Sequence, residues 1–146
     1  MVPMKPEVAI IGMGYVGLTL AATLANKGFK VWGVERQPET VAQLKSGKAH
    51  IFEPGIDDIL TAHVGDNLNV SNEMPKGFSG IVVICVSTPV GPDNTPDLSN
   101  LQSATQSVAE SISEEALVVV RSTVPVGTCR DVVLPILRSH HSTVHL

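Results

Sequence analysis

The sequence predicts an α/β domain built on a doubly wound parallel sheet. Three unbroken apolar runs, rich in β-branched residues, occupy positions 8–11, 81–86 and 117–120. A run without polar alternation is typical of a strand that is covered on both faces, as the strands of a parallel sheet are. Segments with helical apolar spacing separate these runs, and such alternation places helices on both faces of one sheet.

A glycine-rich turn follows the first strand. Gly12, Gly14 and Gly17 stand at the spacing G-x-G-x-x-G. In that pattern the first glycine permits a tight turn, the second lets the backbone approach a pyrophosphate, and the third lets the next helix pack closely on the strand. Glycines that serve packing alone are the alternative. The position between a strand and a helix favours phosphate binding.

The helix after the turn is predicted for residues 15–27, with Gly28 placed to end it. Its N-terminus directs free N–H groups and the positive end of the helix dipole over the glycine turn, which also favours phosphate. Its inward face is expected to carry Val16, Leu20 and Leu24.

An acid ends the second predicted strand, residues 30–35. This residue, Glu35, comes eighteen positions after Gly17. An acid at such a strand end accepts hydrogen bonds from the adenosine ribose hydroxyls and so selects NAD over NADP. The alternative is a solvated surface charge. Because strand, glycines, helix and acid occur in the expected order, the sequence predicts a Rossmann-type dinucleotide-binding domain that uses NAD.

The remaining elements continue the alternation of strands and helices. Pro135 lies inside the last predicted helix, where it removes a backbone hydrogen bond and is expected to bend the axis. Apolar residues 132, 133, 136 and 137 of that helix are not expected to face inward together. The elements after Glu35 are predicted as helices over 38–45 and near 56–60, strands over 67–70 and 81–86, a helix after Ser99, a strand over 117–120 and a helix over 127–138.

Length and charge limit the possible functions. The chain has 146 residues, which is a one-domain length, and residues 1–146 are predicted to form that domain. The net charge of −4 and the lack of a basic cluster argue against a nucleic-acid partner. The longest apolar run, residues 81–86, is too short to cross a bilayer, and no secretory signal precedes the first strand, so no membrane partner is expected.

The cysteines and histidines suggest neither a disulfide nor a metal site. Cys85 and Cys129 do not belong to a C-x-x-C pair and fit a reducing, cytoplasmic location. His140, His141 and His145 lie near the C-terminus without an acid or cysteine partner, so no metal site is expected.

Two further loops are expected beside the glycine turn, because the carboxyl ends of parallel strands form the ligand crevice of such sheets. They are residues 85–89 and 121–128. Turn formation and capping remain open alternatives for their hydroxyl groups. The hydroxyl residues placed to bond a cofactor are Ser87, Thr88, Ser122 and Thr123.

Five motifs in register resemble the N-terminal domain of the UDP-glucose/GDP-mannose dehydrogenase family. They cover almost the whole chain, and Glu-Pro-Gly together with Ser-Thr-Val-Pro separates this family from other Rossmann-type domains. The motifs are Gly-Met-Gly-Tyr-Val-Gly-Leu (12–18), Phe-Glu-Pro-Gly (52–55), Cys-Val-Ser-Thr-Pro (85–89), Pro-Asp-Leu-Ser (96–99) and Ser-Thr-Val-Pro-Val-Gly-Thr (122–128).

The resemblance implies an enzyme that oxidises the C6 alcohol of a nucleotide sugar twice, to the uronic acid, with two NAD and a covalent cysteine intermediate. The sugar would be of the UDP-glucose, UDP-N-acetylhexosamine or GDP-mannose type. Thr123 would also help to hold the water of the second half-reaction. The implied NAD-site positions are Gly12, Met13, Gly14, Tyr15, Val16, Gly17, Glu35, Val86, Ser87, Thr88, Pro89, Ser122 and Thr123.

The chain departs from the family pattern in two ways. Arg36 follows the acid, and Thr40 stands where the family often has a basic residue, which weakens the expected preference for NAD. The family's catalytic acid, sugar-binding residues and nucleophilic cysteine come later in the chain than this segment. The protein is therefore expected to be the N-terminal part of a longer homo-oligomeric enzyme, inactive without the central and C-terminal domains that bind the nucleotide sugar.

Two other functions remain as alternatives. One is a self-standing dinucleotide-binding or sensing module without catalysis. The other is a methyltransferase, a class that also places glycines after the first strand and an acid after the second. The Ser-Thr-Val-Pro loop and the close helix packing implied by Gly17 argue against the methyltransferase.

Overall fold

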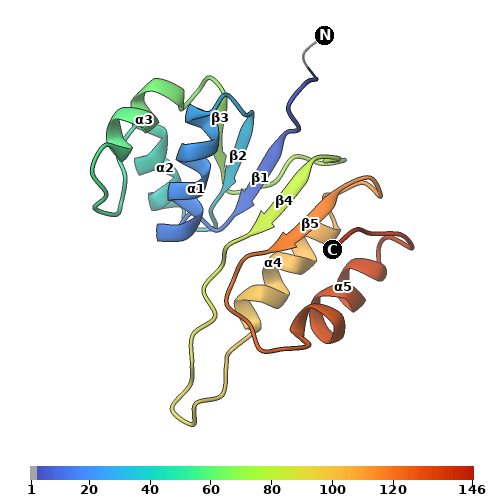
Figure 1. The fold of residues 1–146 in the computed structure, drawn as a ribbon. Coiled ribbons are helices and arrows are strands. Elements are labelled where there is room, and N and C mark those ends of the chain that lie inside the picture. The colour runs from blue at the N-terminus through green and yellow to red at the C-terminus, as the bar shows by residue number, and fades with distance from the viewer. Residues whose placement is uncertain (1–2) are drawn as a thin grey trace.

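A computed structural model of the protein describes residues 3–146 and confirms the predicted fold class. Its strands form a five-stranded, all-parallel sheet in the order β3-β2-β1-β4-β5 (Figure 1). The direction of winding reverses between β1 and β4, which places a switch point at their carboxyl ends. The strands are β1 (Val8–Ile11), β2 (Val31–Val34), β3 (Leu68–Ser71), β4 (Ile81–Ile84) and β5 (Leu117–Val120).

The helices cover the two faces of the sheet, and their buried residues form two apolar clusters, one on each face. Alternate residues of the same strands belong to different clusters, as Val8 and Ala9 do, so one cluster lies between the first three helices and one face of the sheet and the other between the later helices and the opposite face. The helices are α1 (Tyr15–Asn26), α2 (Pro38–Lys45), α3 (Ile56–His63), α4 (Ser99–Ala109), the π-helix η1 (Cys129–Val133) and α5 (Leu134–Arg138).

The strand register brings the loops that follow β1, β2, β4 and β5 to one edge. Ile11 pairs with Val34 on one side and with Ile84 on the other, and Ile84 pairs with Val120. These strand ends are therefore level. The chain leaves each of them at the carboxyl edge of the sheet, where the sequence predicted a ligand crevice.

The inward face of α1 differs from the sequence prediction. The buried residues of the helix are Gly17, Leu18 and three alanines, whereas Val16 is 45% exposed. Leu20 and Leu24 are half-buried at the side of the first cluster. The close approach of the helix at Gly17 explains the difference, because only small residues fit at the points where the helix lies nearest to the strand.

Pro135 produces a change of helix type in place of a simple bend. The turn before it is a π-helix, in which the Leu134 N–H donates to the Cys129 carbonyl five residues back. The wider turn fits the absence of an N–H on Pro135 and relieves the crowding of its ring against the preceding carbonyls. As expected, the apolar residues here do not all face inward, since Val133 and Leu137 are buried and Ile136 is half-buried.

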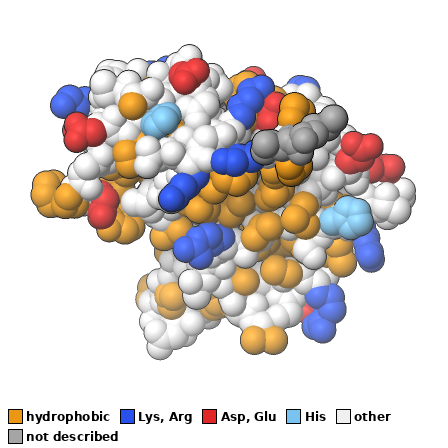
Figure 2. Space-filling model, turned by 45° about the horizontal axis from the view of Figure 1, so that its top comes forward, with side chains coloured by type: hydrophobic (Ala, Val, Ile, Leu, Met, Phe, Trp, Pro, Cys, Tyr) orange, Lys and Arg blue, Asp and Glu red, His pale blue; other side chains and the backbone are white. Residues whose placement is uncertain are grey.

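The outer edge of β5 is partly covered by the end of the chain. The Val118 N–H donates to the His145 carbonyl at 2.8 Å, beside a parallel bridge between Leu117 and His145. On the other face of the strand, Leu117 and Val119 are 40% and 38% exposed. Hydrophobic side chains also gather across the surface seen in Figure 2.

Between residues 3 and 146, no helix combines the length and apolar character that a bilayer crossing requires.

Candidate functional site

The glycine turn after β1 has the geometry that the motif predicted. Gly12 has φ +93°, and a Cβ atom there would lie 2.9 Å from the Cys85 carbonyl oxygen. A Cβ atom at Gly17 would overlap the Gly12 carbonyl oxygen, so α1 approaches the turn as closely as its backbone allows. A Cβ atom at Gly14 would meet nothing within 4 Å. Gly12 and Gly17 are therefore required by the fold, and Gly14 faces open space.

The N-terminus of α1 is free to receive an anion. Gly14 is its N-cap, no side chain caps this end, and the first turn contains no acidic residue. The unpaired N–H groups and the positive end of the helix dipole therefore face the open space at Gly14.

Glu35 is held beside the glycine turn by two backbone hydrogen bonds. Its Oε2 accepts the Met13 N–H and its Oε1 accepts the Gln37 N–H, both at 3.1 Å. The side chain of Met13 is fully buried, and a Cβ atom at Gly33 would lie 2.6 Å from its terminal methyl group. Met13 thus contributes its backbone to the site and its side chain to the core.

A cavity of about 580 Å³ lies along this carboxyl edge. Five of the residues expected at the cofactor site line it, namely Gly12, Gly14, Glu35, Val86 and Ser87. The other expected positions lie outside its wall.

The cavity wall also contains polar residues that the sequence interpretation missed. Asn100, Ser103 and Ser107 of α4 all line it, together with Asn72 after β3. The three α4 residues recur at i, i+3 and i+7, which places them on one face of the helix. That spacing, on the side away from the apolar stripe, is the signal that identifies them.

The loops after β4 and β5 are joined by two hydrogen bonds. The Thr88 hydroxyl donates to the Thr123 carbonyl at 2.6 Å, and the Ser122 hydroxyl donates to the Val86 carbonyl at 2.7 Å. Both hydroxyl protons are therefore used within the protein, which gives Thr88 and Ser122 the structural role left open above. Toward a ligand they offer acceptor lone pairs. Pro89 is exposed and accepts the Asp97 N–H at its carbonyl, at 2.8 Å.

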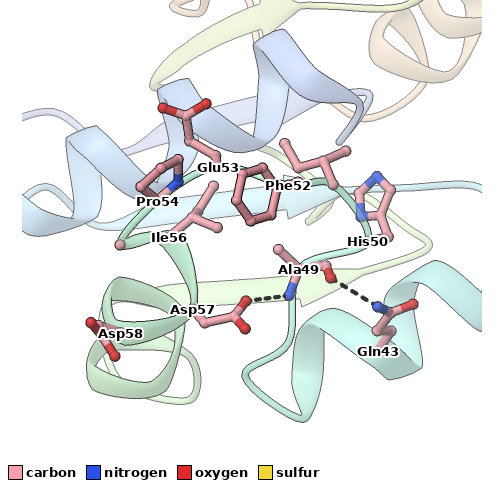
Figure 3. A pocket seen from close by; sticks show the side chains of 11 residues that line it. Gln43, Ala49, His50, Phe52, Glu53, Pro54, Ile56, Asp57 and Asp58 are labelled. Atoms are coloured by element: carbon pink, nitrogen blue, oxygen red, sulfur yellow. Dashed lines mark hydrogen bonds between the residues drawn. The ribbon is translucent and has the colours of Figure 1, made fainter.

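Tyr15 and Val16 are exposed at the start of α1, where Tyr15 contacts the Phe-Glu-Pro-Gly loop. The Tyr15 hydroxyl donates to Glu53, and this hydrogen bond, with the nearby charge, raises the pKa of Tyr15. The loop borders a second cavity of about 530 Å³ (Figure 3). The conformation of the loop is stabilised by the Ala49 N–H, which donates to Asp57 Oδ1 at 2.8 Å. The Phe52 side chain in the loop remains 91% exposed.

The cysteines and histidines have structural environments. Burial raises the pKa of the half-buried Cys85 thiol, which keeps it protonated, and Cys129 begins η1. The His141 ring contacts the Ala109 carbonyl at 2.8 Å, and His145 pairs with β5. Among residues 3–146, no three His, Cys, Asp or Glu side chains gather as a metal site requires.

A doubly wound sheet with an uncapped helix over a glycine turn, and an acid fixed beside that turn, defines a Rossmann-type dinucleotide-binding domain. Comparison with known proteins makes the assignment specific. Residues 6–145 match the model of the UDP-glucose/GDP-mannose dehydrogenase family, NAD binding domain. The chain therefore belongs to this family and comprises its NAD-binding domain.

Individual relatives agree with the family assignment. The chain is 40% identical over 125 residues to UDP-N-acetyl-D-mannosamine dehydrogenase of Pyrococcus horikoshii, covering 84% of this chain and 29% of that protein. It is 38% identical over 129 residues to UDP-glucose 6-dehydrogenase of Pseudomonas aeruginosa, covering 86% of this chain and 28% of that enzyme.

The structural comparison gives the same division of lengths. The solved structure of UDP-D-ManNAc dehydrogenase from Pyrococcus horikoshii superposes with a TM-score of 0.87 and 35% identity. The match covers 95% of this chain and 33% of that one. The chain thus spans about a third of the length of the proteins that it resembles.

Proposed function

We propose that this domain serves a nucleotide-sugar 6-dehydrogenase, which oxidises the sugar C6 alcohol to a carboxylate with NAD. The observation that carries the proposal is the Glu35 carboxylate, held at 3.1 Å from the Met13 N–H beside the open glycine turn of this family's NAD-binding domain. The names of the matched proteins state UDP-glucose, UDP-N-acetyl-D-mannosamine and GDP-mannose as substrates. The substrate class is accordingly a nucleotide-linked hexose.

The residues of the turn fit a dinucleotide. The open space at Gly14 and the uncapped N-terminus of α1 suit the pyrophosphate, and Glu35 suits the two ribose hydroxyls as an acceptor. When bound, NAD would supply the hydride acceptor. The proposed contacts are made by Gly12, Met13, Gly14, Tyr15, Val16, Gly17, Glu35, Val86, Ser87, Thr88, Pro89, Ser122 and Thr123.

Thr123 has a second proposed role. It is exposed, and the Thr88 hydroxyl already fixes its backbone carbonyl. Its own hydroxyl makes no hydrogen bond to another described residue, so it remains available to a ligand or water. We assign it to hold the water that hydrolyses the intermediate in the second oxidation.

The nucleophile of the reaction is assigned to other parts of the enzyme. Cys85 is a poor candidate, because burial raises its thiol pKa and disfavours the reactive thiolate. The chain spans 28–33% of the lengths of the relatives named above, which leaves room for the sugar-binding and catalytic residues elsewhere. The working enzyme is proposed to be a cytoplasmic homo-oligomer.

Calorimetric titration of the purified chain with NADH tests the proposal. We expect weak NADH binding and, in a separate assay that supplies NAD as oxidant, no oxidation of any UDP-sugar, because binding groups are present and a reactive nucleophile is not. Glu35→Gln should weaken NADH binding. Glu39→Gln, the same charge change on the exposed side of α2, should not. No binding, or equal effects of the two variants, would contradict the proposal for the domain.

A non-catalytic dinucleotide-binding module is the second candidate. It is favoured by the way the domain covers its own C-terminal part, since Val133 and Leu137 are fully buried and His145 pairs with β5. Analytical ultracentrifugation, paired with hydrogen exchange over residues 127–146, distinguishes the two functions. A monomer with a protected C-terminus favours the module, and self-association favours a domain made to contact other parts of an enzyme.

A further inference from the structure

A chain of hydrogen bonds crosses the mouth of the cofactor cavity. Arg36 Nη1 donates to Asn100 Oδ1 at 3.2 Å. Asn100 Nδ2 in turn donates to the Ser87 carbonyl at 3.2 Å and to the Ser87 Oγ at 3.1 Å. All three residues line the 580 Å³ cavity. The amide of Asn100 therefore uses its acceptor for Arg36 and its donors for Ser87.

The three residues come from elements on either side of the glycine turn. Arg36 follows β2, Ser87 follows β4 and Asn100 belongs to the first turn of α4. In the sheet, β1 lies between β2 and β4. The bonded chain thus passes across the carboxyl end of β1 on the side of α4. This is the edge at which a dinucleotide binds in folds of this class.

The position of Arg36 affects the choice between NAD and NADP. An acid at the end of β2 favours NAD, because it bonds the 2′-hydroxyl and repels a 2′-phosphate, whereas an arginine nearby accommodates that phosphate. Glu35 and Arg36 are adjacent, so the two preferences compete within one loop. The competition is decided by whether the guanidinium is free to turn toward the ribose position or is held elsewhere.

We propose that Asn100 is a positioning residue for cofactor selectivity, which holds Arg36 toward α4 and away from the 2′-position beside Glu35. The inference rests on the proposed NAD-binding function. Glu35 is turned toward the glycine loop through Met13, and Arg36 is turned toward Asn100, so the two opposite charges diverge. Release of Arg36 would allow it to meet a 2′-phosphate.

The test compares NADH and NADPH affinities of the whole chain by calorimetric titration. Asn100→Leu removes the acceptor for Arg36 and the donors to Ser87 and keeps the same branched arrangement of side-chain heavy atoms. We expect it to reduce the preference for NADH over NADPH by about 2- to 10-fold, the range that one hydrogen bond supports. Adding Arg36→Gln to Asn100→Leu should remove that gain for NADPH. Gln102→Leu makes the same kind of change at an exposed α4 position outside the cavity and should leave the preference unchanged.

A conservative variant separates positioning from simple structural support. Asn100→Asp keeps an acceptor oxygen for Arg36 and loses the N–H donors to Ser87, so we expect it to keep the NADH preference. Retained binding of both cofactors with an unchanged ratio in Asn100→Leu would overturn the inference alone. Failure of the parent chain to bind either cofactor would overturn the proposed function and the inference together.

Discussion

The two halves of the sheet are built differently. The half with β1, β2 and β3 is packed under α1, whose small residues allow contact at backbone distance, and β1 is buried along its whole length. The half with β4 and β5 is packed on α4 and α5, and β5 keeps Leu117 and Val119 more than a third exposed on its other face. In the first half, here called the closed half, β1 is therefore covered on both faces, whereas in the second, the open half, β5 still presents apolar surface.

This difference matches the distribution of the site. The fixed parts, which are the glycine turn and Glu35, belong to the closed half, where steric contact leaves little freedom. The β4 and β5 loops belong to the open half and are joined through side-chain hydroxyls. Rigid geometry thus supports the pyrophosphate and ribose end of the proposed site, and adjustable hydrogen bonds support the other end.

The largest expected effect tests the closed half. Gly17→Val places a side chain where the Gly12 carbonyl oxygen lies, and neither backbone can yield without separating α1 from β1. We expect a loss of at least about 3 kcal/mol in the free energy of unfolding, measured by denaturant titration. Gly14→Ala is the matched control. It has open space and φ −69°, so a change of less than about 1 kcal/mol is expected. Comparable losses in both variants would refute the steric explanation.

The second prediction concerns the core of the open half. Leu137 is fully buried between α5 and α4, so Leu137→Ala should cost about 2–5 kcal/mol. Ile136→Ala, at a half-buried neighbouring position, should cost less. Hydrogen exchange over residues 127–146 then decides how the halves are coupled. Increased exchange confined to this segment would show that the open half unfolds locally. Equal increases throughout would show a single cooperative unit.

The third prediction uses neighbouring residues that point to opposite faces of β5. Val118 is fully buried and Val119 is 38% exposed. Val118→Thr should destabilise the protein by about 1–3 kcal/mol, because it buries a hydroxyl group among apolar side chains. Val119→Thr should stay within about 0.5 kcal/mol of the parent and should reduce any self-association seen by ultracentrifugation. Equal destabilisation would mean that both faces of β5 are covered in solution.

The features that could be predicted from the sequence are those set by neighbours along the chain. Apolar runs located the strands, and the spacing from Gly12 to Gly17 located the turn. The order of strand, turn, helix, strand and acid then placed Glu35 at the cofactor site. The inward face of α1 could not be predicted from hydrophobicity, because the allowed volume at Gly17 decided it. The hydrogen-bond partners of the Thr88 and Ser122 hydroxyls could not be predicted either, because they are carbonyls more than thirty residues away along the chain.

The smallest predicted effect lies at the amino end of the closed half. The Glu7 carboxylate accepts hydrogen bonds from Lys30 Nζ and from Trp32 Nε1, both at 2.9 Å. These bonds, with that from Lys30 the larger, lower the pKa of Glu7 below its ordinary value. The folded protein therefore holds the charged form more strongly than the unfolded chain. The resulting stability is present above the unfolded pKa of about 4.3 and is lost as the pH falls through the folded value.

Trp32 provides a direct reporter of this titration, since it is the only tryptophan of the chain and bonds the titrating group itself. We expect its fluorescence in the folded protein to change with a midpoint below pH 4.3, and Glu7→Gln to abolish that change. The ion pair is nearly half exposed, so Glu7→Gln should cost only about 0.5 kcal/mol or less at neutral pH. Glu115→Gln, an exposed carboxylate in the open half, is the control and should preserve the fluorescence transition. A midpoint at or above the ordinary glutamate value would mean that the contacts of Glu7 do not persist in solution.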